Sequence, residues 1–583
     1  MGQKVLIIGG VAGGASTAAR LRRNDESVQI IMFEKGEYIS FANCGLPYYI
    51  GGSIEERSAL LVQTPKAMKD RFNIDVRVQN EVLSINKDEK TVSVKNHISG
   101  ETYEESYDVL VLSPGSLPLK PPIPGIDSPN IFSLWNIPDT DAVKGYVDTL
   151  KPKRAAIIGG GFIGLEMAEN LHDLGIEVTV VEMANQVMAP IDYEMATIVQ
   201  NHMRNKNVQL YLEDGVKSFA YNEGVTSITL QSGKTVEADM VMLSIGIRPQ
   251  GELAKAAGLA MNERGGIVVN DYLITSDPSI YALGDAIEVT DFMTHQKAMV
   301  PLAGPANKQG RIVANNICRR KEKYHGTQGT AIAKVFDLAV ASTGMNEKTL
   351  KRLGKEIGKD YQVSIIHSKS HAGYYPGSTM MAVKLIFELD GKVLGAQIVG
   401  YGGVDKRIDV IATALRYGGT VQDLTELELA YAPPFSSAKD PVNMVAFTAE
   451  NILLGKTGVA QYYEAVGFDK EKTVLVDVRD LKERERGFIE GSVHIPVNDL
   501  RERLGELDKS KDILLYCAIG LRGYIGARIL KENGFENVRN LSGGYTTYSS
   551  VYCGPENSKD LNCVNCIGVP KETADFNESG EAK

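Results

Sequence analysis

Cysteine and long apolar runs are both scarce in this sequence. Six of its 583 residues are cysteines, at positions 44, 318, 517, 553, 563 and 566. That number is too small for a disulfide framework, so we expect a cytoplasmic protein whose thiols serve chemistry. No apolar run reaches the roughly 18 residues that cross a bilayer. Residues 1–15 also lack the basic start and unbroken apolar stretch of a signal peptide, and we expect no membrane partner.

Positive charge is also in deficit. Lys and Arg number 63 against 73 Asp and Glu, which gives a net charge of −10. This balance argues against a nucleic-acid partner but leaves room for a local basic pocket that binds an anionic ligand. At roughly 150 residues per domain, the length predicts about four domains. The 58 glycines indicate places where the backbone approaches a ligand closely.

Two similar segments predict two dinucleotide-binding units. Each contains an apolar strand, a glycine loop and a helix-favouring run, and each has a later apolar strand that ends in a glycine turn. This order is typical of the Rossmann-like α/β fold, in which the loop and the helix start bind a pyrophosphate. The four parts cover residues 5–8, 9–14, 15–23 and 107–115 in the first unit, and 155–158, 159–164, 165–174 and 238–246 in the second.

The first glycine loop fits the dinucleotide pattern incompletely. Gly9 and Gly14 match G-x-G-x-x-G, but Val11 takes the middle position. Glu34 closes the next predicted strand, where an acid accepts hydrogen bonds from ribose hydroxyls. We therefore expect a nucleotide at this loop in spite of the missing glycine.

The second loop is complete, with Gly159, Gly161 and Gly164 all present. Glu182 ends the strand that follows. A carboxylate at this place repels a 2′-phosphate. The second unit is therefore predicted to bind NADH in preference to NADPH, with NADPH still possible.

Residues 275–285 resemble the second flavin-binding signature of two-dinucleotide flavoproteins. The resemblance implies that FAD occupies the first unit and that Gly284 and Asp285 lie at its ribityl chain.

Beyond residue 326 the pattern of the sequence changes twice. Strand-like segments at 331–341, 362–367, 381–388 and 392–399 and a helical run at 408–417 predict a separate α+β domain. A further α/β unit follows, with strands at 473–478 and 513–516 and a helix at 524–533. We predict an FAD domain at 1–115 and 250–325, an NAD(P)H domain at 116–249, a dimerisation domain at 326–450, a linker at 451–464, a rhodanese-like domain at 465–552 and a flexible cysteine-containing tail at 553–583.

The segment around Cys44, residues 39–52, resembles the redox-active segment of the pyridine nucleotide-disulfide oxidoreductases. The dithiol members of that family have a second cysteine five residues on, where this chain has Tyr49. A single thiol cannot form an internal disulfide, so its oxidised form must be a mixed disulfide, a persulfide or a sulfenic acid. Gly45 and Pro47 predict a short helix start that lowers the pKa of the Cys44 thiol.

Within the single-cysteine branch, the chain resembles the coenzyme A-disulfide reductases over about residues 1–450. The segments that carry this resemblance are residues 9–14, 40–44, 371–377 and 431–440. The NADH oxidases and peroxidases of the same fold have a histidine in the first loop, where this chain has Ala12. This difference argues against a function in peroxide reduction.

The resemblance implies a coenzyme A site and a pair of catalytic tyrosines. Arg20 and Arg23 are three residues apart on one predicted helix, so both can face an anionic ligand. Tyr374 and Tyr431 match a tyrosine pair that reaches the cysteine from the partner subunit, where a phenol donates to a departing sulfur anion. The implied coenzyme A residues are Ser16, Arg20, Arg23, Ser40, Asn43, Arg71, Asn307 and Lys439.

Residues 465–550 resemble a rhodanese domain, with Cys517 at the start of a six-residue loop that leads into a helix. Backbone N–H groups and the helix N-terminus converge on such a sulfur, and Arg522 is expected to add positive charge. Cys563 and Cys566, with Cys553, could bind zinc or resolve a disulfide, but one C-x-x-C pair is a weak signal, and we expect no metal site.

Together these features predict a homodimeric NADH-dependent flavoenzyme that cleaves a sulfur–sulfur bond at Cys44. The favoured substrate is coenzyme A persulfide or polysulfide, with release of hydrogen sulfide and with Cys517 delivering sulfane sulfur. Reduction of coenzyme A disulfide and NADH oxidase activity are alternatives. A non-enzymatic sulfur-transfer or redox-sensing role is the alternative from another class.

Overall fold

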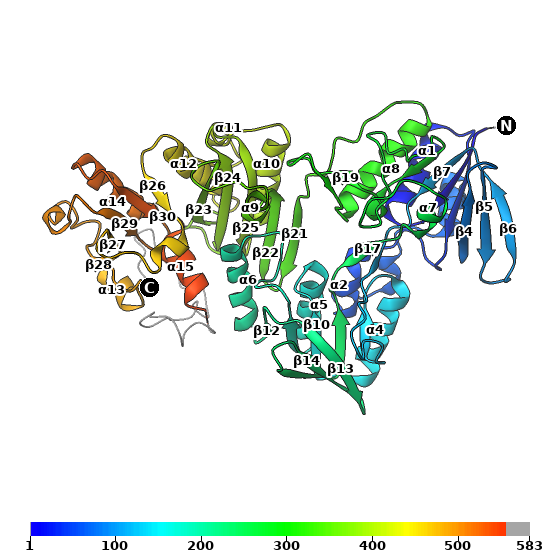
Figure 1. The fold of residues 1–583 in the computed structure, drawn as a ribbon, viewed down its shortest axis with the longest axis horizontal. Helices are drawn as coiled ribbons and strands as arrows, with labels where there is room; N and C mark the ends of the chain where they lie inside the picture. Colours follow the sequence, from blue (N-terminus) through cyan, green and yellow to red (C-terminus); the bar gives the residue numbers. More distant parts are fainter. Residues whose placement is uncertain (1, 555–583) are drawn as a thin grey trace. The chain divides into compact units, whose positions relative to one another are not determined.

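The computed structural model describes residues 2–554, which form two compact units (Figure 1). The first unit contains the described chain up to residue 185 together with residues 211–329. The second contains residues 186–210 and the described chain from residue 330 onward. Among residues 2–554, no helix combines the length and the apolar character that a membrane span needs.

A parallel five-stranded sheet with the strand order β18-β7-β1-β2-β3 forms the first Rossmann-like domain. The run Val5–Ile8 is buried on both faces of this sheet, as its apolar residues require in a parallel sheet covered by helices. Its elements are β1 (Lys4–Ile8), α1 (Ala12–Asn24), β2 (Gln29–Glu34), β3 (Asp75–Val78), β7 (Val109–Leu112), β18 (Ile280–Ala282) and α8 (Ala303–Ile317), with the antiparallel strands β4 (Asn80–Asn86), β5 (Thr91–Asn96) and β6 (Thr102–Ser106) beside them.

The second Rossmann-like domain repeats this design. Its sheet contains the parallel strands β11-β10-β16-β9 in that order. The elements are β9 (Ile131–Ser133), α4 (Ile137–Leu150), β10 (Arg154–Ile158), α5 (Phe162–Asp173), β11 (Glu177–Val181) and β16 (Met240–Leu243), with the antiparallel strands β13 (Val216–Asn222), β14 (Val225–Leu230) and β15 (Thr235–Ala238).

An antiparallel sheet with the order β21-β22-β25-β24-β23 forms the α+β domain of the second unit. The segment 331–341, expected as one strand, is a hairpin, because the chain turns at Phe336 in the left-handed region with φ +55°. The elements are β21 (Ala331–Val335), β22 (Leu338–Gly344), α9 (Glu347–Arg352), β23 (Tyr361–Lys369), β24 (Met380–Glu388), β25 (Val393–Gly400), α10 (Val404–Arg416), α11 (Val421–Glu426) and α12 (Pro441–Leu453).

The C-terminal domain is a parallel sheet with the order β26-β30-β29-β27-β28. Its first strand, β26, spans Gly458–Ala460 and so falls inside the segment expected to be a linker. The remaining elements are β27 (Thr473–Asp477), α13 (Leu481–Glu485), β28 (Val493–His494), β29 (Asp512–Tyr516), α14 (Leu521–Glu532), β30 (Val538–Leu541) and α15 (Gly544–Tyr552). With two Rossmann-like sheets, one α+β domain and this α/β domain, the predicted fold class is confirmed.

Helix α15 joins the C-terminal domain to the α+β domain within the second unit. The Ile365 amide donates to Ser542 Oγ at 3.0 Å, and His367 Nε2 lies 2.8 Å from Thr547 Oγ1. Burial lowers the pKa of His367 to about 4, so the imidazole at this junction is neutral at neutral pH. On α6 (Tyr193–Asn205), Asn201 Nδ2 donates to the Ser550 carbonyl at 2.8 Å.

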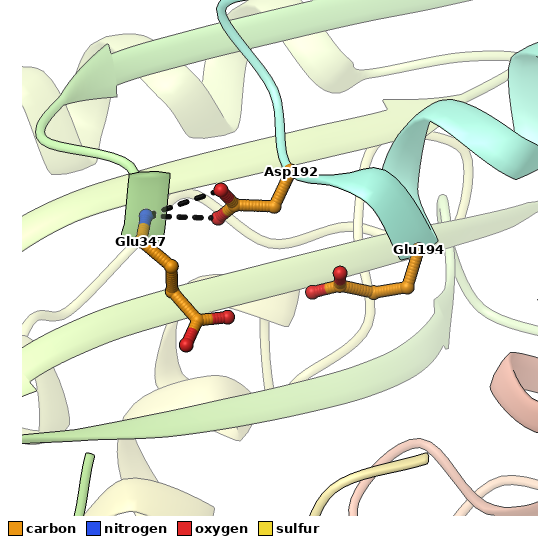
Figure 2. A group of neighbouring side chains, drawn as sticks. All are labelled: Asp192, Glu194 and Glu347. Atoms are coloured by element: carbon orange, nitrogen blue, oxygen red, sulfur yellow. Dashed lines mark hydrogen bonds between the residues drawn. The ribbon is translucent and has the colours of Figure 1, made fainter. Parts of the chain in front are cut away.

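A buried ion cluster holds α6 against the α+β sheet. Lys384, on β24, is fully buried, and its Nζ pairs with Asp192 at 2.9 Å, with Glu347 at 2.6 Å and with Glu194. Figure 2 shows the three carboxylates converging from α6 and α9, with the Glu347 amide donating to Asp192. These contacts explain why residues 186–210, expected in the NAD(P)H domain, group with the second unit.

Replacing Lys384 should destabilise the second unit strongly. In Lys384→Met three buried acidic groups lose their only cation in the cluster, and breaking a buried pair costs about 3–5 kcal/mol. We expect a lower midpoint of thermal unfolding, measured by calorimetry. Lys351→Met on the exposed side of α9 is the control, and equal midpoints for the two variants would contradict a structural role for the cluster.

Candidate active site

Both glycine loops are pressed against the end of a returning strand. A Cβ on Gly9, which has φ +98°, would lie 2.0 Å from the Ser113 carbonyl oxygen, and one on Gly159, with φ +108°, would lie 2.3 Å from that of Ser244. Only glycine fits either position. Gly161 has open space around its Cα, which leaves room for a ligand to reach the backbone of the second loop.

The third glycine of each loop allows the helix to approach the strand. A Cβ on Gly14 would lie 1.9 Å from the Gly9 carbonyl oxygen, and one on Gly164 would lie 2.1 Å from that of Gly159. In the first loop Val11 is the N-cap residue of α1. The missing middle glycine therefore leaves the fold of this loop intact.

The two predicted ribose-binding acids are held in the same way. Glu34 accepts hydrogen bonds from the Gly10 amide at 3.0 Å and the Gly36 amide at 2.8 Å. Glu182 accepts from the Gly160 amide at 2.7 Å and the Ala184 amide at 2.8 Å. Each carboxylate is fixed beside its glycine loop, as ribose recognition requires.

Asp285 lies where the flavin signature places it. It follows Gly284, whose φ of +78° favours glycine, and it accepts a hydrogen bond from Ser116 Oγ at 2.9 Å. Burial raises the pKa of the Asp285 carboxyl group. A half-buried acid with spare hydrogen-bonding capacity fits a polyol chain.

Cys44 is exposed and lies in a short 3-10 turn, Asn43–Gly45. The segment is tied to the first glycine loop, because the Ser40 amide donates to the Gly10 carbonyl at 2.9 Å. Ser40 itself has φ +45°. Asn43 Nδ2 contacts the Trp135 carbonyl at 3.4 Å, while its Oδ1 is buried without a partner, so that atom is available to a ligand.

The expected lowering of the Cys44 pKa is wrong. Burial and the nearby carboxyl group of Glu166 raise the pKa of this thiol. The following helix, α2 (Leu46–Ile50), is only one turn long, too short to offset both effects.

Glu166, on α5, is a site residue that sequence reasoning missed. Burial and the neighbouring Glu169 raise its pKa to about 7. Burial and the same two carboxyl groups raise the pKa of Tyr48, on α2, to about 12. The pattern Glu-x-x-Glu on the helix after a glycine loop was the available signal, since it puts two acids on one helix face.

Ser16 and Asn307 meet across the packed helices α1 and α8, where the Ser16 hydroxyl donates to Asn307 Oδ1. Arg20 Nε donates to Asn315 at 3.1 Å. Burial and the positive charges of Arg311, Arg320 and Arg23 lower the pKa of Arg20. These arginines form a basic cluster that suits an anionic ligand.

Arg311 and Arg320 were not predicted. Arg311 lies one helical turn after Asn307 on α8, so helix periodicity could have found it. Arg320 lies beyond the end of α8, where no periodic pattern applies. Arg71, at the end of α3 (Pro65–Phe72), and Lys439 are exposed and lie in different units.

The predicted tyrosine pair does form. The hydroxyls of Tyr374 and Tyr431 are 2.9 Å apart, although the residues lie 57 positions apart in the chain. Their side chains are 67% and 48% exposed. Nearby Tyr375 and Phe435 are also exposed, so the pair belongs to an apolar surface of the kind that protein interfaces use.

Buried Arg407 holds the two tyrosine loops together. Its Nη2 donates to the Ser370 carbonyl at 2.9 Å, to Ser436 Oγ at 3.1 Å and to Asp440 at 3.0 Å. Ser370 precedes Tyr374, and the other two partners follow Tyr431. Nothing in the sequence distinguishes this arginine from Arg416, the other arginine of α10.

Cys517 is 1% exposed at the end of β29. The Gly520 amide donates to its Sγ at 3.1 Å, and Gly520 has φ +112°. Helix α14 begins at the next residue, and the Tyr545 amide at the start of α15 donates to the Cys517 carbonyl at 2.8 Å. One amide, that of Gly520, therefore bonds to the sulfur, while the Tyr545 amide bonds to the backbone of the same residue.

The positive charge of Arg522 is paired with an acid, contrary to the expectation that it faces the Cys517 sulfur. Its Nη1 and Nη2 each donate to Glu483 on α13 at 2.6 Å. Glu483 was not predicted.

Cys553 lies at the C-cap of α15, whereas Cys563 and Cys566 lie outside the described residues. Within residues 2–554, the one acidic group with metal-ligand spacing is the cluster around Lys384.

Comparison with known proteins assigns the domains. Residues 3–310 match the model of the pyridine nucleotide-disulphide oxidoreductase family. The chain belongs to this family. Residues 330–441 match the family's dimerisation domain, and residues 460–550 match the rhodanese-like domain. Membership of the family implies FAD and NAD(H) as cofactors, and the two glycine loops, their acids and Asp285 fit them.

Three relatives are similar over most of the chain. Coenzyme A disulfide reductase of Staphylococcus haemolyticus (strain JCSC1435) is 37% identical over 456 residues, which cover 77% of this chain and 100% of the relative. The reduced form of Bacillus anthracis CoADR-RHD is 54% identical with a TM-score of 0.92, covering 96% of this chain and 99% of that one. An NAD-dependent persulfide reductase from A. fulgidus is 40% identical with a TM-score of 0.87, covering 94% and 100%. This chain is therefore an NAD(P)H-dependent oxidoreductase that acts on sulfur.

Glu166→Gln should lower the pKa of Cys44. The Glu166 carboxyl group ionises as the pH rises through about 7, and its negative charge then disfavours the Cys44 thiolate. We expect alkylation of Cys44 by iodoacetamide, followed by mass spectrometry, to begin at lower pH in the variant. The control is Glu177→Gln at an exposed position of β11. Identical pH profiles for wild type and Glu166→Gln would refute the coupling.

Proposed function

We propose that this protein is an NADH-dependent reductase of coenzyme A persulfide or polysulfide that releases hydrogen sulfide. The observation that carries the proposal is the single Cys44, with Tyr49 in place of a second cysteine, on a segment tied to Gly10. The similarity to a coenzyme A disulfide reductase and to an NAD-dependent persulfide reductase supports it. Coenzyme A disulfide reduction uses the same thiol and is the second candidate.

Cys44 is the nucleophile in the proposed reaction. Its thiolate attacks the coenzyme A sulfur of the persulfide, forming a mixed disulfide while HS⁻ leaves with the electron pair of the broken S–S bond. When bound, FAD supplies the two electrons that originate from NADH. Two electrons then split the mixed disulfide, which releases the coenzyme A thiolate and restores the Cys44 thiolate.

The tyrosine pair supplies a proton in this scheme. A phenol hydroxyl of Tyr374 or Tyr431 donates to the leaving HS⁻, and the 2.9 Å contact between them lets one hydroxyl support the other. We assign the pair to Cys44 of the second subunit in a homodimer. The exposed aromatic surface around the pair and the dimerisation domain support this assignment.

The cytoplasmic location of the protein stays a prediction.

The basic cluster is the proposed site for the anionic part of coenzyme A. Ser16, Asn43 and Asn307 supply hydrogen-bonding groups, and Arg20, Arg23, Arg311 and Arg320 supply positive charge. Arg71, in the same unit as these residues, is assigned to this proposed site. Lys439 lies in the second unit, and its place at a coenzyme A site stays a prediction. The rhodanese-like domain, in which the Gly520 amide bonds to Cys517, is proposed to capture sulfane sulfur and deliver it to coenzyme A or towards Cys44.

Substitution of Cys44 and substitution of Cys517 should affect NADH oxidation differently. Cys44→Ser should abolish NADH oxidation with preformed coenzyme A persulfide and with coenzyme A disulfide, because no other thiol receives the electrons. Cys517→Ser should leave both reactions nearly intact and remove only turnover that depends on sulfur capture. NADH absorbance in flavin-loaded protein measures both. If Cys517→Ser loses the persulfide reaction as completely as Cys44→Ser, the delivery role is wrong.

Arg311→Ala should weaken binding of coenzyme A substrates. Loss of a cation that contacts a phosphate in ground and transition states alike raises KM, here by about tenfold, and leaves kcat almost unchanged. Steady-state kinetics with coenzyme A disulfide measure this. Arg319→Ala is the matched control, since Arg319 is exposed and is not one of the charges that act on Arg20. Equal KM values for the two variants would count against the proposed site.

The enzyme should prefer NADH to NADPH because of Glu182. Its carboxylate is fixed by two amides and opposes a 2′-phosphate. We expect a higher kcat/KM for NADH, and a smaller preference in Glu182→Ala. Glu177→Ala is the control on the same strand, and equal kcat/KM values for both cofactors in the wild type would exclude this role.

A further inference from the structure

The loop that holds Cys517 is not a cationic pocket. Arg522 is the only cation among residues 517–522, and both of its Nη atoms bond to Glu483 at 2.6 Å. Asp480 lies 3.9 Å from the same guanidinium. The positive charge of Arg522 is therefore already engaged by two carboxylates.

Arg479 and Arg484 of this domain both pair with Asp477. Arg479, which is 3% exposed, bonds to Asp477 at 2.8 Å and lies 4.2 Å from the centre of the Tyr545 ring. Arg484 bonds to the same Asp477 at 3.2 Å and to Ser492 at 2.9 Å. Both guanidinium groups stabilise the interior of the domain.

Exposed apolar side chains belong to the loop of Cys517 and to the helices α13 and α14 beside it. Ile519 and Leu521 belong to the loop itself and are 36% and 59% exposed. Ile525, one turn further along α14, is 40% exposed, and Leu481, on the helix that carries Glu483, is 59% exposed. We call these four residues the apolar rim. Exposed apolar groups beside a reactive group indicate contact with an apolar part of a ligand.

We propose that Cys517 takes its sulfur from an alkyl persulfide, R–S–SH, and discriminates against dianionic donors such as thiosulfate. The alkyl chain lies against the apolar rim, and the outer sulfur reaches Sγ. This inference rests on the sulfur-delivery role proposed above and names the chemical class of the donor.

The sulfur-transfer step needs no oxidant. The Cys517 thiolate attacks the outer sulfur of R–S–SH, a new S–S bond forms on Cys517, and the S–S bond of the donor breaks. The alkyl thiolate leaves with the electron pair and takes a proton from solvent. When the donor reacts in its protonated form, R–S–SH, the thiolate supplies the single negative charge of the reacting pair, and even the ionised persulfide has one negative charge fewer than thiosulfate.

Thiosulfate would place far more charge in the same pocket. Its two negative charges and that of the thiolate would meet beside Arg522, whose positive charge is already engaged by Glu483 and Asp480. The leaving group would be the sulfite dianion. The Gly520 amide, at 3.1 Å from Sγ, is the one hydrogen bond to the sulfur among the described residues, and one neutral donor does not offset repulsion of this size.

The test measures how fast Cys517 becomes persulfidated in the full-length, flavin-loaded protein. N-acetylcysteamine persulfide and thiosulfate are the two probes, and alkylation followed by mass spectrometry of the Cys517 peptide is the readout. We expect the wild type to load at least about tenfold faster from the alkyl persulfide. The Cys517→Ser variant, which has no thiol at this position, gives the background signal of the assay.

Two variants separate charge from apolar contact. Glu483→Gln keeps the capping box that begins α13, since glutamine serves there as well as glutamate. It leaves the charge of Arg522 uncompensated, so loading from thiosulfate should rise about tenfold while loading from the alkyl persulfide changes by less than about twofold. Leu521→Ser should slow only the alkyl persulfide. Circular dichroism verifies folding of both.

Each outcome decides between the proposals. Equal loading of the wild type from both probes, or no gain for thiosulfate in folded Glu483→Gln, overturns the donor assignment and leaves the delivery role standing. Loading from neither probe overturns the delivery role itself.

Discussion

The lack of a Cβ at two glycines determines the geometry of the catalytic half of the molecule. At Gly9 and Gly159 the carbonyl oxygen of a returning strand occupies the place where a Cβ would lie. Each loop therefore lies directly on its sheet, so that a helix begins beyond it and an acid from the next strand reaches its amides. The Cys44 segment depends on the same constraint, because its Ser40 amide bonds to Gly10, the neighbour of Gly9.

The two sulfur atoms lie in different surroundings. Desolvation and the nearby Glu166 raise the pKa of Cys44, whereas Cys517 is buried and receives an amide hydrogen bond. A basic cluster also lies in the unit of Cys44, while the arginine near Cys517 is neutralised. This contrast suits a division of labour in which one thiol meets a large anionic substrate and the other meets a small donor.

Local sequence patterns were sufficient for the fold class and for the local geometry of several predicted site residues. The glycine loops, Glu34, Glu182 and the strand–loop–helix around Cys517 could be predicted because each depends on neighbours within about 20 residues. Arg407, Glu483, Arg320 and the Lys384 cluster could not, since their partners come from distant parts of the chain. The Cys44 pKa was mispredicted for the same reason, because its desolvation and its neighbour Glu166, 122 positions away, both come from tertiary packing.

The bonds of Arg407 have a consequence for protein engineering. Because one guanidinium ties the loop of Tyr374 to the loop of Tyr431, neither loop is an independent module. A loop taken from a relative would place its tyrosine correctly only if Ser436, Asp440 and the Ser370 carbonyl kept their positions around the arginine. The two loops and α10 are therefore the smallest unit that can be exchanged between relatives with the hydroxyl pair intact.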